Sequence, residues 1–197
     1  MPRIEADVTR RRSAVLSSWM EAQPLTLPAG GRDSVAPLPA AFERLFRAEY
    51  VRVVGIANRI LGDQGEAEDV AQEVFLSFYR AHPADAGYAS AWLHAAAAHA
   101  ALNTIRSRTR RTRRETAQAL APDAAAPDDP AAVVAVTETQ SEVRAILGRL
   151  PERSAALLAL RYSGLSYEEI AAALDVRASS VGTLLRRAED AFRRELQ

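Results

Sequence analysis

Arginine is concentrated between residues 106 and 114, where guanidinium groups offer bidentate contacts to phosphate or guanine. The arginines there are Arg106, Arg108, Arg110, Arg111, Arg113 and Arg114. They follow a stretch that contains Trp92, His94, His99 and Asn103. An aromatic side chain, polar groups along one face and a basic end suit the binding of a nucleic-acid strand. A solvated helix end, stabilised by the negative end of its dipole, explains the arginines equally well.

A second charged group is acidic and occupies residues 66–73. Its members are Glu66, Glu68, Asp69, Gln72 and Glu73. Acidic side chains near a helix N-terminus are favoured by the helix dipole; a docking face for a basic protein surface is the functional alternative. No histidine lies nearby, and no glycine-rich phosphate loop follows a strand. We therefore expect no enzyme, no metal site and no cofactor.

The last fifty residues have the pattern of a helix-turn-helix. A short amphipathic helix over 153–162 precedes a break at Ser163-Gly164-Leu165. Ser166 and Glu169 form a capping box that opens the next helix. A final helix over 178–196 follows a tight connection and carries Arg186 and Arg187, which favours DNA reading through the major groove. Any three-helix packing unit would show similar apolar spacing.

The elements that position these groups are all predicted to be helical. Apolar residues at three-four spacing predict a helix from Ala40 that ends at Leu61-Gly62-Asp63. Further helices are expected over 66–80 and 91–111, separated by a loop over 82–90. The fold class is therefore all-α: two small helical domains joined by a flexible linker, the C-terminal one a helix-turn-helix.

Composition sets the domain boundaries. Residues 1–39 are rich in proline, glycine and charge and predict a disordered extension. Residues 40–114 form the first helical domain, 115–132 an acidic, proline-bearing linker, and 133–197 the second domain.

The overall charge excludes some classes of protein. The chain has 197 residues, with 25 basic and 25 acidic side chains and a formal net charge of zero. Because non-specific DNA affinity comes mostly from neutralised phosphates, we expect weak binding to free duplex and a partner that assists it. The chain has no cysteine, and no apolar run approaches the roughly 20 residues of a membrane span. We expect a cytoplasmic protein without membrane insertion.

Several motifs together resemble the extracytoplasmic-function (ECF) sigma factors of bacterial RNA polymerase. They are RILGD at 59–63, EAEDVAQEVF at 66–75, Trp92-Leu93, the arginine-rich stretch at 106–114, LPER at 150–153 and GLSYEEIA at 164–171. His99 and Asn103 depart from the pattern, since many members carry Asn and Asp there. The final helix over 178–196, which is expected to read DNA, also carries fewer basic residues than in many members.

This resemblance implies a dissociable subunit that directs RNA polymerase core enzyme to promoter DNA and helps to open the promoter. It also implies that a separate anti-sigma factor controls this subunit. The residues implied in polymerase binding are Glu68, Asp69, Gln72 and Glu73. Those implied at the minus-ten element are Trp92, His94, His99, Asn103, Arg106, Arg108, Arg110 and Arg111. Those implied at the minus-thirty-five element are Arg177, Ser179, Ser180, Thr183, Arg186 and Arg187.

Other classes of protein remain open on the residues alone. A stand-alone helix-turn-helix regulator would bind operators as a dimer and would need strong DNA affinity of its own, which the zero net charge disfavours. A helical adaptor would make no DNA contact at all, so that removing Arg186 and Arg187 would leave transcription unchanged.

Overall fold

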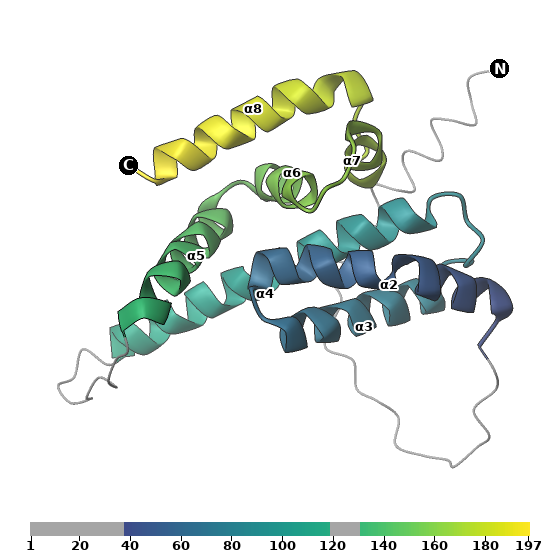
Figure 1. Ribbon diagram of the computed structural model, residues 1–197, viewed down its shortest axis with the longest axis horizontal. Coiled ribbons are helices and arrows are strands. Elements are labelled where there is room, and N and C mark those ends of the chain that lie inside the picture. The colour runs from purple at the N-terminus through teal and green to yellow at the C-terminus, as the bar shows by residue number, and fades with distance from the viewer. Residues whose placement is uncertain (1–37, 119–130) are drawn as a thin grey trace, which may run out of the picture. The chain divides into compact units, whose positions relative to one another are not determined.

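The computed structural model describes residues 38–118 and 131–197. Its helices, labelled in Figure 1, are α2 (Ala40–Leu61), α3 (Gln64–Ala81), α4 (Ala89–Gln118), α5 (Ala131–Arg149), α6 (Glu152–Tyr162), α7 (Tyr167–Leu174) and α8 (Ala178–Glu195). Across these described ranges there is no strand, and the predicted all-α fold is confirmed. The predicted N-terminal extension and linker fall mainly at 1–37 and 119–130, outside the described residues.

The connection between α2 and α3 depends on one glycine and one aspartate. Gly62 has a φ of 70°, and its N–H donates to the carbonyl of Asn58 at 2.7 Å. Glycine takes this left-handed conformation without a Cβ penalty, so it commonly ends helices. Asp63 then accepts from the backbone N–H of Glu66 at 2.9 Å and caps α3. The predicted helix end at 61–63 is confirmed.

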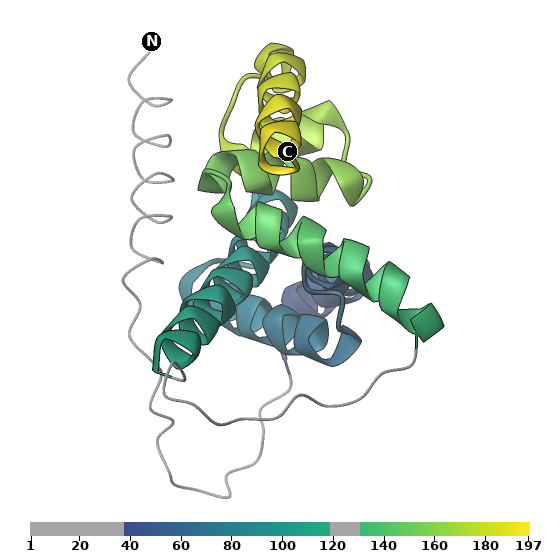
Figure 2. The ribbon, with the colours of Figure 1, turned by 90° about the vertical axis from the view of Figure 1, so that its left-hand side faces the viewer.

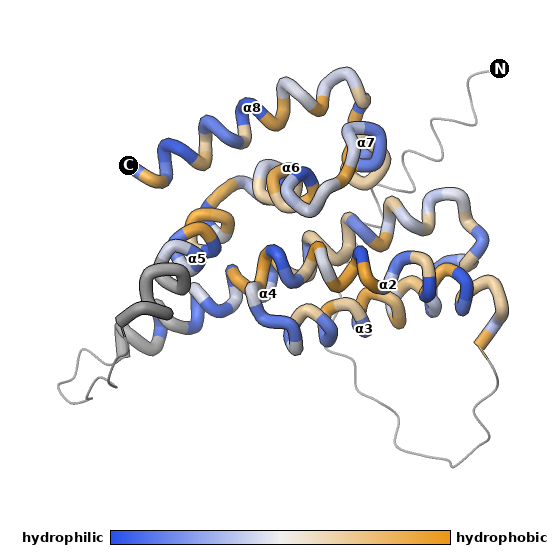
Figure 3. Tube along the Cα trace, viewed as in Figure 1, coloured by the Kyte–Doolittle hydropathy of each residue, from blue (hydrophilic) through white to orange (hydrophobic). Residues whose placement is uncertain are grey.

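The apolar stripes of α2, α3 and α4 form one core, and hydrophobic stretches run along all three helices in Figure 3. The fully buried large side chains of this core include Val53, Ile56, Ile60, Phe78, Leu93 and Leu102. Aromatic rings join α2 to α3: the centroids of Phe46 and Phe75 lie 4.8 Å apart, as do those of Phe42 and Tyr79. Such ring pairs stabilise packing beyond the area they bury, so α3 has a fixed position beside α2.

The middle of α4 is buried all round its circumference. Residues 93–98, four of them alanine, are all buried, because α2 and α3 pack on α4 and so do α6 and α7. Alanine favours helix and leaves room for neighbours to approach closely. The helix continues to Gln118, past the predicted end near Arg111. Arginine is also a good helix former, which explains why the arginine-rich stretch does not end it.

Helices α6, α7 and α8 form the C-terminal core, with Leu160, Leu165 and Ile170 fully buried. The capping box is confirmed: the Ser166 hydroxyl accepts from the Glu169 N–H at 3.2 Å, and the Ser166 N–H donates to the Glu169 carboxylate at 2.8 Å. Asp175 ends α7 with a φ of 51°. Aspartate tolerates this conformation better than most residues, which allows the tight turn into α8.

The capping box predicts an acid-sensitive contribution to stability. The backbone N–H of Ser166 holds the pKa of Glu169 below its ordinary value; burial opposes this shift and the Arg52 guanidinium reinforces it. A carboxylate with a lowered pKa stabilises the fold above the unfolded pKa of about 4.3 and loses that contribution as the pH falls through the folded value. Glu169→Gln should therefore lower the urea midpoint at pH 7 and have little effect near pH 3.

The matched control is Glu168→Gln, which changes the neighbouring acidic residue of the same helical turn. Its midpoint should stay near that of the parent at both pH values. If Glu169→Gln lowered the urea midpoint equally at pH 7 and pH 3, the charge of the Glu169 carboxylate would not contribute to the stability of the cap.

Candidate nucleic-acid interface

An acidic face runs along the outer side of α3. Asp69, Gln72 and Glu73 are exposed, while Glu68 is half-buried and accepts from the side chain of Gln64 at 2.8 Å. They lie one turn apart at i, i+3 and i+4, so they share one side of the helix. Leu76 continues that side and is 52% exposed. Acidic groups beside an exposed apolar side chain make a surface suited to a basic protein partner.

The end of α4 presents several exposed polar and basic groups. Asn103, Arg108, Arg110 and Arg111 are exposed. Arg108 forms an ion pair with Glu66 of α3, and the Arg110 guanidinium donates to the Ser107 hydroxyl at 3.1 Å. Exposed ion pairs of this kind are worth roughly 0–1 kcal/mol, so a phosphate can replace the carboxylate partner.

His94, which was expected to contact the minus-ten element, lies inside the protein. Its side chain is 2% exposed, and its Nε2 lies 2.8 Å from the carboxylate of Glu49 on α2. Within the described residues its Nδ1 has no hydrogen-bond partner. In this conformation His94 cannot contact DNA, because neighbouring helices cover it. Its contact with Glu49 instead fixes α4 against α2.

His99 and Arg106 also point toward the protein rather than toward solvent. The Nδ1 of His99 lies 2.6 Å from Glu152 Oε1 at the start of α6. The Arg106 guanidinium donates to the backbone carbonyl oxygens of Gly148, at 3.4 Å, and Leu150, at 3.2 Å. More than forty positions of the chain separate the two members of each contact. No local spacing pattern could therefore predict these contacts.

Trp92 belongs to an aromatic cluster that sequence reasoning missed. Its ring lies 4.9 Å from the ring of His82 and 5.4 Å from that of Phe78. Tyr88 completes the cluster, with its hydroxyl 3.3 Å from His82 Nδ1. Burial lowers the pKa of His82, which favours the neutral imidazole. His82 and Tyr88 were not predicted as site residues, because residues 82–90 have the proline and glycine content of a connecting loop.

The start and one side of α8 are open to solvent. Arg177, Ser179, Thr183, Arg186 and Arg187 are exposed, and Ser180 is half-buried. On the opposite side, Val181, Leu185 and Ala188 are buried against the rest of the C-terminal helices. Polar and apolar residues therefore alternate along α8 in Figure 3. Within the described part of the chain, Arg186 and Arg187 have no ion-pair or hydrogen-bond partner, so both guanidinium groups can reach a ligand.

Two properties of the described residues bear on other kinds of function. None of the helices in 38–118 and 131–197 has the length and apolarity required to cross a bilayer. The same ranges contain no cluster of three or more His, Cys, Asp or Glu side chains arranged to hold a metal ion.

Comparison with known families gives two matches along the chain. The family described as Sigma-70 region 2 matches residues 45–111, and the family described as Sigma-70, region 4 matches residues 140–191. The first match contains the acidic face of α3 and most of α4; the second contains α6, α7 and the exposed side of α8.

Similar proteins extend over most of the chain. The ECF RNA polymerase sigma factor SigE of Mycolicibacterium smegmatis is 29% identical over 184 residues, which cover 90% of this chain and 70% of the relative. The RNA polymerase sigma-H factor of Pseudomonas aeruginosa is 32% identical over 168 residues, which cover 80% of this chain and 86% of the relative. Among solved structures, CnrH in complex with the cytosolic domain of CnrY is 21% identical with a TM-score of 0.47, covering 79% of this chain and 86% of that one.

Proposed function

Since this chain belongs to the ECF-type sigma factors of RNA polymerase, which are initiation factors rather than enzymes, we propose a specific role for each of its exposed surfaces. The observation that carries the assignment is one chain with an exposed acidic helix face and a separate helix-turn-helix with an exposed polar face. The first surface suits a protein partner and the second suits duplex DNA.

Polymerase core enzyme binds the outer side of α3 in this proposal. Glu68, Asp69, Gln72 and Glu73 supply the polar contacts, and the exposed Leu76 supplies an apolar one. Charge complementarity at such a surface speeds association and orients the partners. The helix is held by the buried core on its other side, so the face is presented without a conformational change of α3 itself.

The minus-ten element is opened and held along α4 and its preceding loop. Trp92 and the His82–Tyr88 contact shape an aromatic surface where an unpaired base can stack. Asn103, Arg108, Arg110 and Arg111 provide polar and phosphate contacts along the exposed part of the helix. His94 acts as a positioning residue through Glu49, and His99 and Arg106 become available once their present partners leave.

The minus-thirty-five element is read by α8. An exposed helix N-terminus followed by a polar side is the arrangement that enters the major groove in helix-turn-helix proteins. Ser179, Ser180 and Thr183 lie nearest the beginning of this helix, preceded by Arg177. Arg186 and Arg187 follow one to two turns later, where they reach a base edge or a phosphate.

We further propose that a separate anti-sigma factor restrains this protein and that both act in the cytoplasm, where polymerase and promoter DNA meet. Members of the family are usually restrained in this way, and the acidic face of α3 is a surface that such an inhibitor can cover. Coexpression with the inhibitor should remove binding to core enzyme; an inhibitor that leaves core binding intact would have to act on DNA contacts instead.

The experiment that tests the function is reconstituted transcription. Core polymerase and this purified chain, incubated with genomic fragments, should start transcripts at a defined set of positions, and core enzyme alone should not. Discrete starts should disappear when either component is omitted. A stand-alone regulator predicts the opposite pattern: dimers by light scattering and a tight gel shift without polymerase.

A further inference from the structure

His82 ends α3 and lies at the centre of the aromatic cluster at the start of α4. Its ring centroid lies 5.1 Å from that of Phe78, with the two rings stacked, and 5.8 Å from that of Tyr88, with the rings edge to face. The Trp92 ring centroid lies 4.9 Å from that of His82. We propose that His82 is a positioning residue whose neutral imidazole holds the loop over 82–88 against Trp92, so that an unpaired promoter base meets a preformed surface.

The loop is anchored at both ends by backbone hydrogen bonds. The His82 N–H donates to the carbonyl of Phe78 at 2.9 Å, and the Trp92 N–H donates to the carbonyl of Tyr88 at 2.9 Å. Between these anchors the backbone makes two more hydrogen bonds, both within 83–89. These local bonds shape the loop itself. Its position against α4 depends on side-chain contacts across it.

The polar contact across the loop joins His82 to Tyr88. The Nδ1 of His82 lies 3.3 Å from the Tyr88 hydroxyl, and both residues are half-buried. In the neutral tautomer that carries its proton on Nε2, Nδ1 accepts a hydrogen bond from this hydroxyl. The bond connects the first residue of the loop to the last, and so keeps the loop folded beside Trp92.

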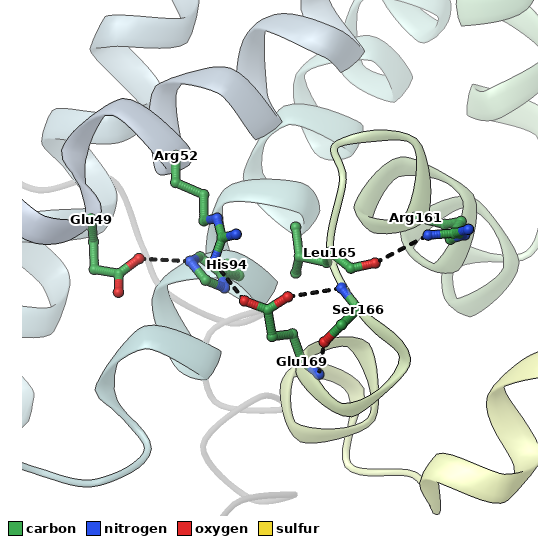
Figure 4. A network of polar contacts seen from close by, with 7 residues as sticks. All are labelled: Glu49, Arg52, His94, Arg161, Leu165, Ser166 and Glu169. Carbon is green, nitrogen blue, oxygen red and sulfur yellow. Dashed lines mark hydrogen bonds and ion pairs between the residues drawn. The ribbon is translucent and has the colours of Figure 1, made fainter.

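The start of α4 is fixed independently of the loop. Leu93 is fully buried, and the Nε2 of His94 lies 2.8 Å from the Glu49 carboxylate of α2, as Figure 4 shows. Trp92 directly precedes these two residues, so its backbone has little freedom. In Figure 1 and Figure 2, α5 lies beside the C-terminal half of α4, whereas the loop leads into its N-terminal end. The loop is therefore the adjustable partner in this contact, and α4 is the fixed one.

The surroundings of His82 favour the neutral imidazole. The titratable group that faces the ring is the Tyr88 hydroxyl, and the helices α3 and α4 present aromatic rings that do not titrate. The charged residues on either side in the sequence, Arg80 and Asp85, are exposed. Burial lowers the pKa of His82 below its ordinary value of 6.5.

The sign of the pH effect follows from this lowered pKa. The ordered loop binds a proton less readily than an open loop in which His82 is solvated. The contribution of His82 to the order of the loop is therefore complete above about pH 6.5, and it is lost as the pH falls from there through the lower pKa of the ordered state.

A preformed loop acts on one step of initiation, the capture of an unpaired base, and in this respect the inference rests on the proposed minus-ten surface. Ordering a loop at the moment of binding costs affinity. The apparent affinity falls in proportion to the fraction of molecules in the competent arrangement. His82 should therefore affect promoter opening, and it should leave duplex reading by α8 unchanged.

The first test uses the free chain and needs neither polymerase nor DNA. The chain has two tryptophans, so Trp19→Phe leaves Trp92 as the only one. Quenching of Trp92 fluorescence by acrylamide should rise about twofold as the pH falls from 7.5 to 5, because protonation of His82 opens the loop. Adding His82→Ala should give the higher quenching at both pH values, and adding His82→Phe, whose ring cannot titrate, should give the lower quenching at both. A pH response that persists in His82→Phe, or quenching that His82→Ala leaves unchanged, would overturn the inference.

The second test measures promoter opening by the reconstituted holoenzyme, with 2-aminopurine placed in the minus-ten region of a promoter that the chain is found to use. His82→Ala should open about tenfold less promoter than the parent at pH 7.5, because most molecules then lack the ordered loop. His82→Phe should recover most of this loss and, unlike the parent, keep its level at pH 5.5. Arg80→Gln, at the exposed end of α3, is the matched control: it should follow the parent at both pH values, which accounts for the pH response of polymerase itself.

Two comparisons separate a failure of this inference from a failure of the minus-ten surface. Full opening by Trp92→Ala would refute the surface and the role of His82 with it. Loss of opening by Trp92→Ala together with full opening by His82→Ala would overturn the role of His82 alone. If circular dichroism shows that His82→Ala does not fold, the comparison of the parent with His82→Phe decides, and equal pH responses of the two would overturn the inference.

Discussion

Reversing two charges on α3, by Asp69→Lys with Glu73→Lys, should lower the affinity for core polymerase by about 100-fold or more, that is by about 3 kcal/mol. Both side chains are exposed and lie on the side of the helix that continues to Leu76. A basic partner surface would then face two like charges. Because neither residue is buried, the fold itself should be unaffected, and circular dichroism should show unchanged helix content and melting.

The affinity is best measured by titrating labelled chain with core enzyme at two salt concentrations. Since screening weakens exposed charge interactions, the parent chain should lose affinity as salt rises and the variant much less. Glu142→Lys reverses one charge on the exposed part of α5, and it should bind core enzyme like the parent. Unchanged affinity of the double variant would remove α3 from the polymerase interface.

The second large effect is expected on α8. Arg186→Ala with Arg187→Ala should reduce transcription from cognate promoters by about 10- to 1000-fold, because a bidentate guanidinium contact to a base is worth about 1–3 kcal/mol. Both side chains are exposed and have no partner within the described residues, so their loss disturbs no internal contact. Binding to core enzyme should stay at the level of the parent chain.

The two single variants separate base reading from phosphate binding. Loss of a base contact relaxes preference at one promoter position, whereas loss of a phosphate contact weakens all promoters alike and reduces the salt slope by about 1. Arg194→Ala, at the far end of the same helix, is the control and should leave promoter choice and salt slope unchanged. Full transcription by the double variant would favour a helical adaptor surface in place of DNA reading.

Local patterns were sufficient to predict most of the helices and two of their ends, although α5 was not predicted and α4 runs past its predicted end. The Gly62–Asp63 helix end and the Ser166–Glu169 capping box depend on residues within four positions of one another. Val70, Val74, Phe75 and Phe78 lie at three-four spacing in α3, and all four are buried. Backbone hydrogen bonding and side-chain periodicity act over one or two turns, so the amino-acid order alone determines them.

The environment of the polar residues on α4 was decided by tertiary packing. His99 and Arg106 have the i, i+7 spacing of one helix face, and His94 lies about 140° around the helix from His99. Their partners are far away in the chain: Glu49 lies 45 positions from His94, and Glu152 lies 53 positions from His99. No local rule relates residues so far apart. The amino-acid order by itself determined that α4 would be a long helix with a basic end. Only the packing of five other helices of the described residues around it determined which polar side chains face solvent and which are held inside, because burial depends on what comes to lie opposite each side chain.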